Sequence, residues 1–104
     1  MMDFFRFDNR LGILIPHLVD DWDHYSSETR EMVLFQWEKI RGAIPDRITD
    51  LEKEINKKQS ALSEESDFKK SCHLNSEIAD LASIINDLWL WYRTNQDITG
   101  KAHL

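Results

Sequence analysis

Apolar residues in the second half of the chain repeat at alternating steps of four and three residues, and this spacing constrains the fold more than any other feature. The repeat consists of Leu74, Ile78, Leu81, Ile85, Leu88 and Tyr92. Such spacing places the side chains on one face of an α-helix. No Gly or Pro interrupts residues 67–95, and Ser66 can cap the first turn. The pattern therefore predicts a long helix over residues 67–95.

A second apolar repeat precedes the first and predicts another long helix, over residues 27–63. Its members are Val33, Trp37, Ile40, Ile44, Ile48, Leu51, Ile55 and Leu62. Pro45 lies inside this repeat, and proline in a helix lacks a backbone donor and crowds the preceding turn. The repeat keeps its phase across Pro45, which favours a kinked helix. A break into two helices is the alternative.

A polar segment at residues 60–66 suits a turn between the two helices. If the chain folds back at this segment, Trp37 lies beside Tyr92 and Ile44 lies beside Ile85. Both apolar stripes are then used along their whole lengths. The sequence therefore predicts an antiparallel helical hairpin.

The N-terminal segment allows two interpretations. In one, residues 5–7 pair with residues 13–15 as a small β-hairpin around a loop at residues 9–12. In the other, the helical spacing of Leu11 and the apolar residues that follow it starts a helix near Asn9. The residues alone leave both interpretations open.

We favour an apolar arm over residues 1–15 followed by a short helix over residues 16–25, because proline suits the first turn of a helix. The polar residues 96–104 are expected to fray. These elements together predict an all-α fold in a single domain over residues 1–104. A short N-terminal helix packs on a long antiparallel hairpin with a proline-kinked central helix, and this three-helix bundle is expected to dimerise into a larger helical bundle.

Composition excludes several classes of partner. Charged residues make up 31% of the chain and the formal net charge is −6, which argues against nucleic acids and anionic membranes, since both attract Lys and Arg. Cys72 is the one cysteine, and a lone cysteine without a signal peptide indicates a reducing compartment. No apolar run approaches the roughly 20 residues of a membrane span. We therefore expect a cytoplasmic protein that binds neither nucleic acid nor membrane.

The predicted bundle is thicker at one end than at the other. The N-terminal helix can cover the end that is rich in aromatic residues, whereas residues 45–78 are two helices thick and leave apolar surface in water. Pairing with a second copy would bury this surface in a four-helix bundle, so we expect a homodimer. The alternative occupant is a different protein. The candidate partner-binding residues are Phe35, Trp89, Leu90 and Trp91.

Four residues near the N-terminus have the types and spacing of a metal site: His17, Asp20, Asp21 and His24. On a helix they would lie on one side, and His and carboxylate side chains three or four residues apart can share a divalent metal. The same residues would equally form an acidic, solvated face. The chain lacks the paired Glu-x-x-His motifs that metal sites in helical bundles use.

No motif points to catalysis, because the chain has neither a nucleophile elbow nor a glycine-rich phosphate loop. We therefore expect no enzymatic activity and no cofactor. The leading hypothesis is a small acidic helical protein that acts through protein–protein interaction, in a regulatory or adaptor role. The alternative is a helical bundle that binds metal through the face containing His17, Asp20, Asp21 and His24.

Overall fold

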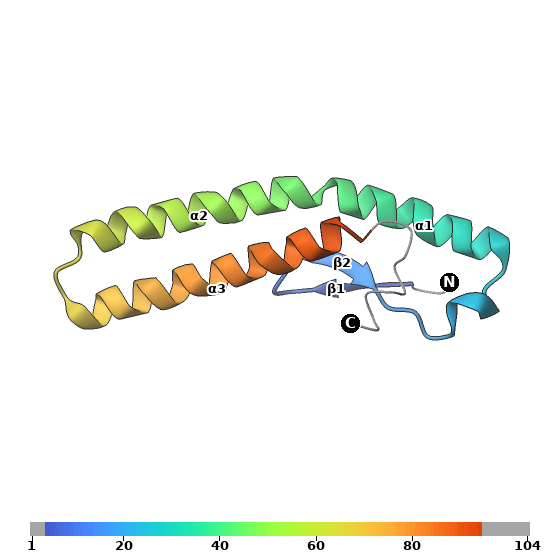
Figure 1. Cartoon of the computed structure of the whole chain (residues 1–104), viewed down its shortest axis with the longest axis horizontal. Coiled ribbons are helices and arrows are strands. Elements are labelled where there is room, and N and C mark those ends of the chain that lie inside the picture. Colours follow the sequence, from blue (N-terminus) through green and yellow to red (C-terminus); the bar gives the residue numbers. More distant parts are fainter. Residues whose placement is uncertain (1–3, 95–104) are drawn as a thin grey trace.

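Two long helices that lie side by side form most of the molecule (Figure 1). The computed structural model describes residues 4–94, and the molecule measures 60 × 23 × 22 Å. The elements follow in the order β1 (Phe5–Asp8), β2 (Ile13–Pro16), the 3₁₀ helix η1 (Trp22–His24), α1 (Ser27–Gly42), α2 (Ile44–Glu64) and α3 (Phe68–Tyr92). Among these described residues, no helix combines the length and the apolar character that crossing a membrane requires.

The N-terminal segment forms a β-hairpin, so the expected all-α fold is wrong. β1 and β2 pair antiparallel, with Phe5 opposite Pro16. Exposure alternates along β2, where Ile13 and Ile15 are buried and Leu14 is exposed. Alternation of this kind belongs to a strand that packs one face on the core. A period of two, and not a helical period, therefore decides the structure of this segment.

The turn between the strands depends on Asp8 and Gly12. The Asp8 carbonyl oxygen accepts a hydrogen bond from the Gly12 amide (2.7 Å), and the Asp8 side chain accepts one from the Leu11 amide (2.8 Å). Gly12 has a φ of +74°, which glycine adopts at little cost. A Cβ atom on Gly12 would lie 2.6 Å from Arg47 Nε. The turn therefore favours glycine, and a larger residue would also displace the Arg47 guanidinium.

The short helix expected over residues 16–25 is absent. Pro16 ends β2, and within this described segment only Trp22–His24 form a turn of 3₁₀ helix. The Asp20 amide donates a hydrogen bond to the Tyr25 hydroxyl (3.0 Å), and Tyr25 is buried. The segment is therefore a loop anchored by one core side chain, and the helical spacing of its apolar residues does not reflect a helix.

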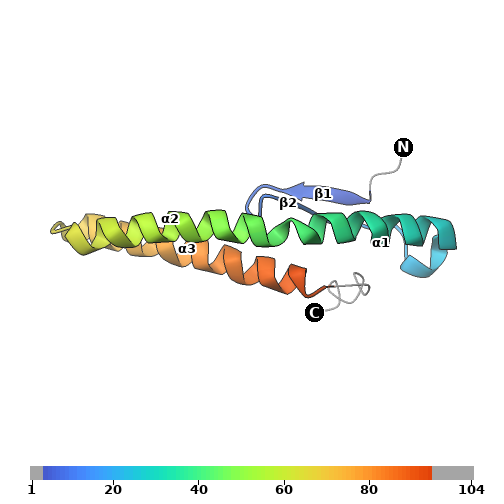
Figure 2. The same ribbon diagram turned by 90° about the horizontal axis from the view of Figure 1, so that it is seen from above.

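The segment expected to be one kinked helix is divided at Ala43 into α1 and α2. Ala43 has a φ of −89° and a ψ of −8°, and its amide donates to the Ile40 carbonyl oxygen (3.1 Å). Pro45 lies in the first turn of α2, where the missing N–H group is not needed. The two helices follow one another along the long axis of the molecule (Figure 2), and both Trp37 and Ile44 are fully buried.

α2 and α3 run antiparallel and are joined by a tight turn (Figure 1). Asp67, and not Ser66, caps α3, because its side chain accepts hydrogen bonds from two backbone amides of the first turn (2.9 and 3.2 Å). Farther along the hairpin, Lys58 Nζ donates to Glu77 Oε2 (3.2 Å). The end of the hairpin near Asp67 is termed the tip.

The hydrophobic core lies at the end of the hairpin opposite the tip. Trp37 stacks on Phe5 with ring centroids 6.4 Å apart and meets the ring of Trp91 edge-on at 5.6 Å. Trp37 Nε1 donates to the Thr94 carbonyl oxygen (2.7 Å). The buried residues are Phe4, Leu11, Ile13, Ile15, Tyr25, Val33, Trp37, Ile44, Ile48, Leu51 and Leu88. No residue in the described range 52–87 is buried, so the core thins out toward the tip.

Alanine substitutions at two glycines are expected to change stability in opposite directions. Gly12→Ala should lower the free energy of unfolding by about 1–2 kcal/mol, because its φ is left-handed and Arg47 must move away from the Leu11 carbonyl oxygen. Gly42→Ala should raise it by up to about 1 kcal/mol, because Gly42 is helical and a Cβ there meets nothing within 4 Å. Urea unfolding followed by circular dichroism measures both, and equal losses would contradict the role assigned to Gly12.

Candidate interaction surface

The β-hairpin lies over one face of the layer formed by α2 and α3, only at the end of that layer opposite the tip (Figures 1 and 2). Arg10 donates to Asp87 Oδ2 (2.7 Å) and to Ser83 Oγ (3.0 Å) on α3. Arg47 Nε on α2 donates to the Leu11 carbonyl oxygen (2.9 Å). Figure 2 shows β1 and β2 on one side of α2 and α3, and no other described strand or helix lies against them on the opposite side. These two sides are termed the covered face and the open face.

Helical geometry assigns the residues of α2 and α3 to the two faces, at about 100° per residue. Arg47, Ser83 and Asp87 mark the covered face through their contacts with the β-hairpin. The open face contains Pro45, Thr49, Glu52, Ile55, Asn56, Gln59 and Ser63 of α2 and Phe68, Ser71, Asn75, Ile78, Ala82, Ile85, Asn86 and Trp89 of α3. Glu52 is the one charged residue in this set, and Lys53 lies at its outer edge, about 40° from Thr49.

The covered face is rich in ionisable side chains. They are Arg47, Asp50, Glu54, Lys57, Lys58, Lys69, His73, Asp80 and Asp87. Lys57 Nζ lies 3.6 Å from Glu54 Oε1, in an exposed ion pair. Because 31% of the chain is charged, the near absence of charge from the open face is a strong bias. Depletion of charge is the compositional mark of the central part of a protein–protein interface.

A groove of about 550 Å³ lies between α2 and α3 on the open face. It is lined by Glu52, Ile55, Asn56, Gln59, Ala82 and Ile85. Ile55 and Ile85 are half-buried, and Ala82 is exposed. The small side chain of Ala82 leaves room for a side chain or a helix that approaches from outside.

An apolar stripe continues from the groove toward the C-terminal end of α3. Its members are Ile78, Ala82, Ile85 and Trp89. Trp89 is 37% exposed, and its ring meets Tyr92 edge-on with centroids 5.5 Å apart. Leu90 follows and is 40% exposed. The stripe therefore joins the groove to an exposed aromatic ring.

The structure separates the four residues predicted to bind a partner. Trp91 is half-buried and packs edge-on against Trp37 (5.6 Å). Phe35 is 63% exposed, but it lies on the side of α1 opposite Trp37, and Lys39 Nζ is 4.5 Å from its ring centroid. The remaining two, Trp89 and Leu90, are neighbours on the exposed surface of α3.

Arg41 holds the C-terminal end of α3 against α1. Its Nη1 donates to the Tyr92 carbonyl oxygen (2.9 Å), and its guanidinium carbon lies 5.0 Å from the Tyr92 ring centroid. Glu38 accepts two hydrogen bonds from the same guanidinium (3.2 and 3.0 Å). The Glu38 hydrogen bond raises the pKa of Arg41. The position of Tyr92, and with it the neighbouring ring of Trp89, is thereby fixed.

The residues predicted to bind metal do not lie on a common helix. His17, Asp20 and Asp21 lie in the loop after β2, and His24 ends η1. Within residues 4–94, no three or more His, Cys, Asp or Glu side chains gather closely enough to hold a metal ion. The helical spacing on which the metal hypothesis was based is therefore not found in this segment.

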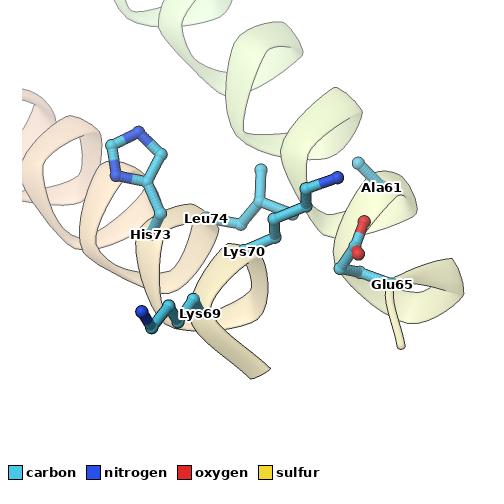
Figure 3. A pocket seen from close by; sticks show the side chains of 6 residues that line it. All are labelled: Ala61, Glu65, Lys69, Lys70, His73 and Leu74. Carbon is cyan, nitrogen blue, oxygen red and sulfur yellow. The ribbon is translucent and has the colours of Figure 1, made fainter. Parts of the chain in front are cut away.

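A second pocket, of about 450 Å³, lies at the tip and is lined by Ala61, Glu65, Lys69, Lys70, His73 and Leu74. Figure 3 shows Lys70 and Leu74 extending from α3 toward the end of α2, whereas Lys69 points away. Basic side chains at the start of a helix favour an anion. However, the amides of Lys69 and Lys70 already donate to the Asp67 carboxylate. An anion in this pocket would therefore contact the basic side chains, because these two amides already have hydrogen-bond partners.

Comparison of the chain with models of known families, with curated proteins and with solved structures finds no match. The interpretation of the open face therefore rests on its own geometry and chemistry.

The sequence predicted Trp89 as a partner-binding residue, and Trp89 is exposed, but it did not single out the other residues of the open face. The prediction followed the apolar residues of each helix and did not follow the charged ones. A helical projection of the charges on α2 and α3 separates the two faces, because Glu52 and, at the edge, Lys53 are the charged residues on one of them.

The two tryptophans near the end of α3 are expected to respond differently to truncation. Trp91→Ala should lower the free energy of unfolding by about 2–4 kcal/mol, because it leaves a cavity beside the buried ring of Trp37. Trp89→Ala should lower it by less than about 1.5 kcal/mol, because its side chain is more exposed and loses mainly the contact with Tyr92. Urea titrations of both variants measure the difference. A larger loss for Trp89→Ala would contradict this assignment.

Proposed function

We propose that the protein is a non-enzymatic interaction protein, with a regulatory or adaptor role, whose binding surface is the open face of α2 and α3. The observation that supports this proposal most directly is the distribution of charge. The open face carries Glu52 and, at its outer edge, Lys53 as its charged side chains, in a chain with 31% charged residues. Moving a charged group out of water costs free energy. A surface with few charged groups therefore costs less free energy to dehydrate when a partner binds.

The polar residues of the open face also suit a binding surface. Besides the apolar stripe it carries four amide side chains, which are Asn56, Gln59, Asn75 and Asn86. Amides can both donate and accept hydrogen bonds, so they can be satisfied by a partner or by trapped water. They supply directional contacts around the groove at Ile55 and Ile85.

The helical hairpin formed by α2 and α3 is held in place at both of its ends. The β-hairpin fixes the base of α2 and α3 through Arg10 and Arg47 (2.7 to 3.0 Å). Turn geometry and the Asp67 cap fix the tip. A surface that is already ordered before binding loses less conformational entropy when a partner docks.

A pair of charge substitutions on α3 tests the proposed function. Ala82→Glu places a carboxylate in the groove of the open face, and Ser76→Glu places the same group on the covered side of the same helix. Both positions are exposed, so both variants are expected to fold. The tagged chain, cross-linked in lysate from its source cells, should retain its bound proteins with Ser76→Glu and lose at least one with Ala82→Glu.

Circular dichroism of both variants serves as the control for folding. If the set of cross-linked proteins, with further copies of this chain counted among them, is the same for wild type and Ala82→Glu, the open face is not a binding surface and the proposed function is wrong.

A further inference from the structure

We infer that the occupant of the open face is a second copy of this chain, so that two hairpins face one another in a four-helix bundle. This inference rests on the proposed function and names its partner. Three independent properties of the described helices support it: the placement of charge, the size of the face, and the incomplete burial of the apolar seam near the tip.

The placement of charge selects the open face as the place where two copies can meet. Each chain carries a formal net charge of −6, so two copies repel one another. A closed dimer with twofold symmetry brings the same patch of both chains together. On the covered face the β-hairpin already occupies the base, where it contacts Arg47, Ser83 and Asp87. On the open face the charged side chains of the helices are Glu52 and, at the outer edge, Lys53, so like charges add little repulsion.

The scarcity of charge distinguishes a second copy from a charged partner. A strongly basic or acidic partner would be matched by opposite charges, because complementary potentials steer and orient charged surfaces. The helices place one Glu on the open face and one Lys, Lys53, at its outer edge, so neither sign of charge dominates. A partner that matches this face has little net charge and is apolar and rich in amides, which describes the open face of a second copy.

The size of the open face also suits a stable dimer. α2 and α3 run side by side over about 20 residues, which corresponds to about 30 Å at 1.5 Å per residue, and two helices together are about 20 Å wide. The projected area of the face is then about 600 Å². The accessible surface of interdigitating side chains exceeds the projected area, and a standard interface takes about 800 Å² from each partner. The face therefore approaches the size of a standard interface.

The apolar seam near the tip is incompletely buried within one chain. Ile55, Leu62, Leu74 and Ile78 are half-buried, and no residue in the described range 52–87 is fully buried. Four-helix bundles bury such seams by packing two helix pairs around a common core. The exposed Ala82 in the middle of α3 allows the helices of a second copy to approach closely.

Sedimentation velocity of the full chain, at concentrations from about 1 to about 200 µM, tests the inference. A reducing agent prevents the exposed Cys72 from linking copies covalently. The wild type should sediment at twice the mass of one chain. Ala82→Glu should raise the dissociation constant of the dimer by about tenfold or more, because it places two carboxylates in the interface. Ser76→Glu on the covered side should leave it within about twofold.

Two further variants sharpen the result. Asn75→Glu, at another exposed position of the open face, should weaken the dimer as Ala82→Glu does, so the test does not depend on one substitution. Glu52→Gln removes the one acidic group of the face and should leave the dimer unchanged or tighter. A weaker dimer with Glu52→Gln would mean that this face meets a basic surface and would overturn the symmetric pairing.

The outcomes separate this inference from the proposed function. A wild type that is monomeric at the highest concentration, or a dimer that is weakened by Ser76→Glu and not by Ala82→Glu, overturns the inference. If the wild type is monomeric while Ala82→Glu still loses a different cross-linked protein, the dimer is wrong and the proposed function stands. If the chain is monomeric and no cross-linked protein is lost, both are wrong.

Discussion

The burial of Trp37 is the constraint on which the rest of the structure depends. Its ring joins parts of the chain that are far apart in sequence, because it contacts Phe5 of β1 on one side and Trp91 of α3 on the other. Its indole N–H donates to the Thr94 carbonyl oxygen (2.7 Å), so the ring is buried without an unsatisfied donor. This cluster fixes the position of α3 against α1. Helical geometry then determines which residues of α2 and α3 face away from the β-hairpin.

Helical periodicity predicted that the residues of α2 and α3 are helical, because each helix places a continuous apolar stripe against its neighbour, but it joined α1 and α2 into one kinked helix. The β-hairpin could not be chosen over a helix on the same basis. Its strands have four residues each, which is too short for a period of two to stand out. It is held by contacts to residues far along the chain, namely Arg10 with Asp87 and Arg47 with Leu11. Local spacing carries no information about such contacts.

The candidate surface was predictable only in part for a related reason. The sequence shows where the aromatic residues are, but which of them are exposed depends on tertiary packing. Trp91 packs against Trp37, whereas Trp89, only two residues away, remains on the surface. The charge bias of the open face is encoded in helical positions alone. It becomes meaningful once the β-hairpin is known to lie on the other side at the base of the two helices, and that knowledge comes from the structure.

Burial declines from the Trp37 cluster toward the tip, so we expect the tip to unfold locally more readily than the base. Free energy of local opening follows buried apolar contact, so the turn at Asp67 and the adjoining helical turns belong to a less stable cooperative unit than the base. We expect amide protons there to exchange with solvent through partial opening, and those around the buried Val33 and Leu88 to exchange through unfolding of the whole chain. The distance between α2 and α3 can therefore change at the tip while the base around Trp37 stays folded.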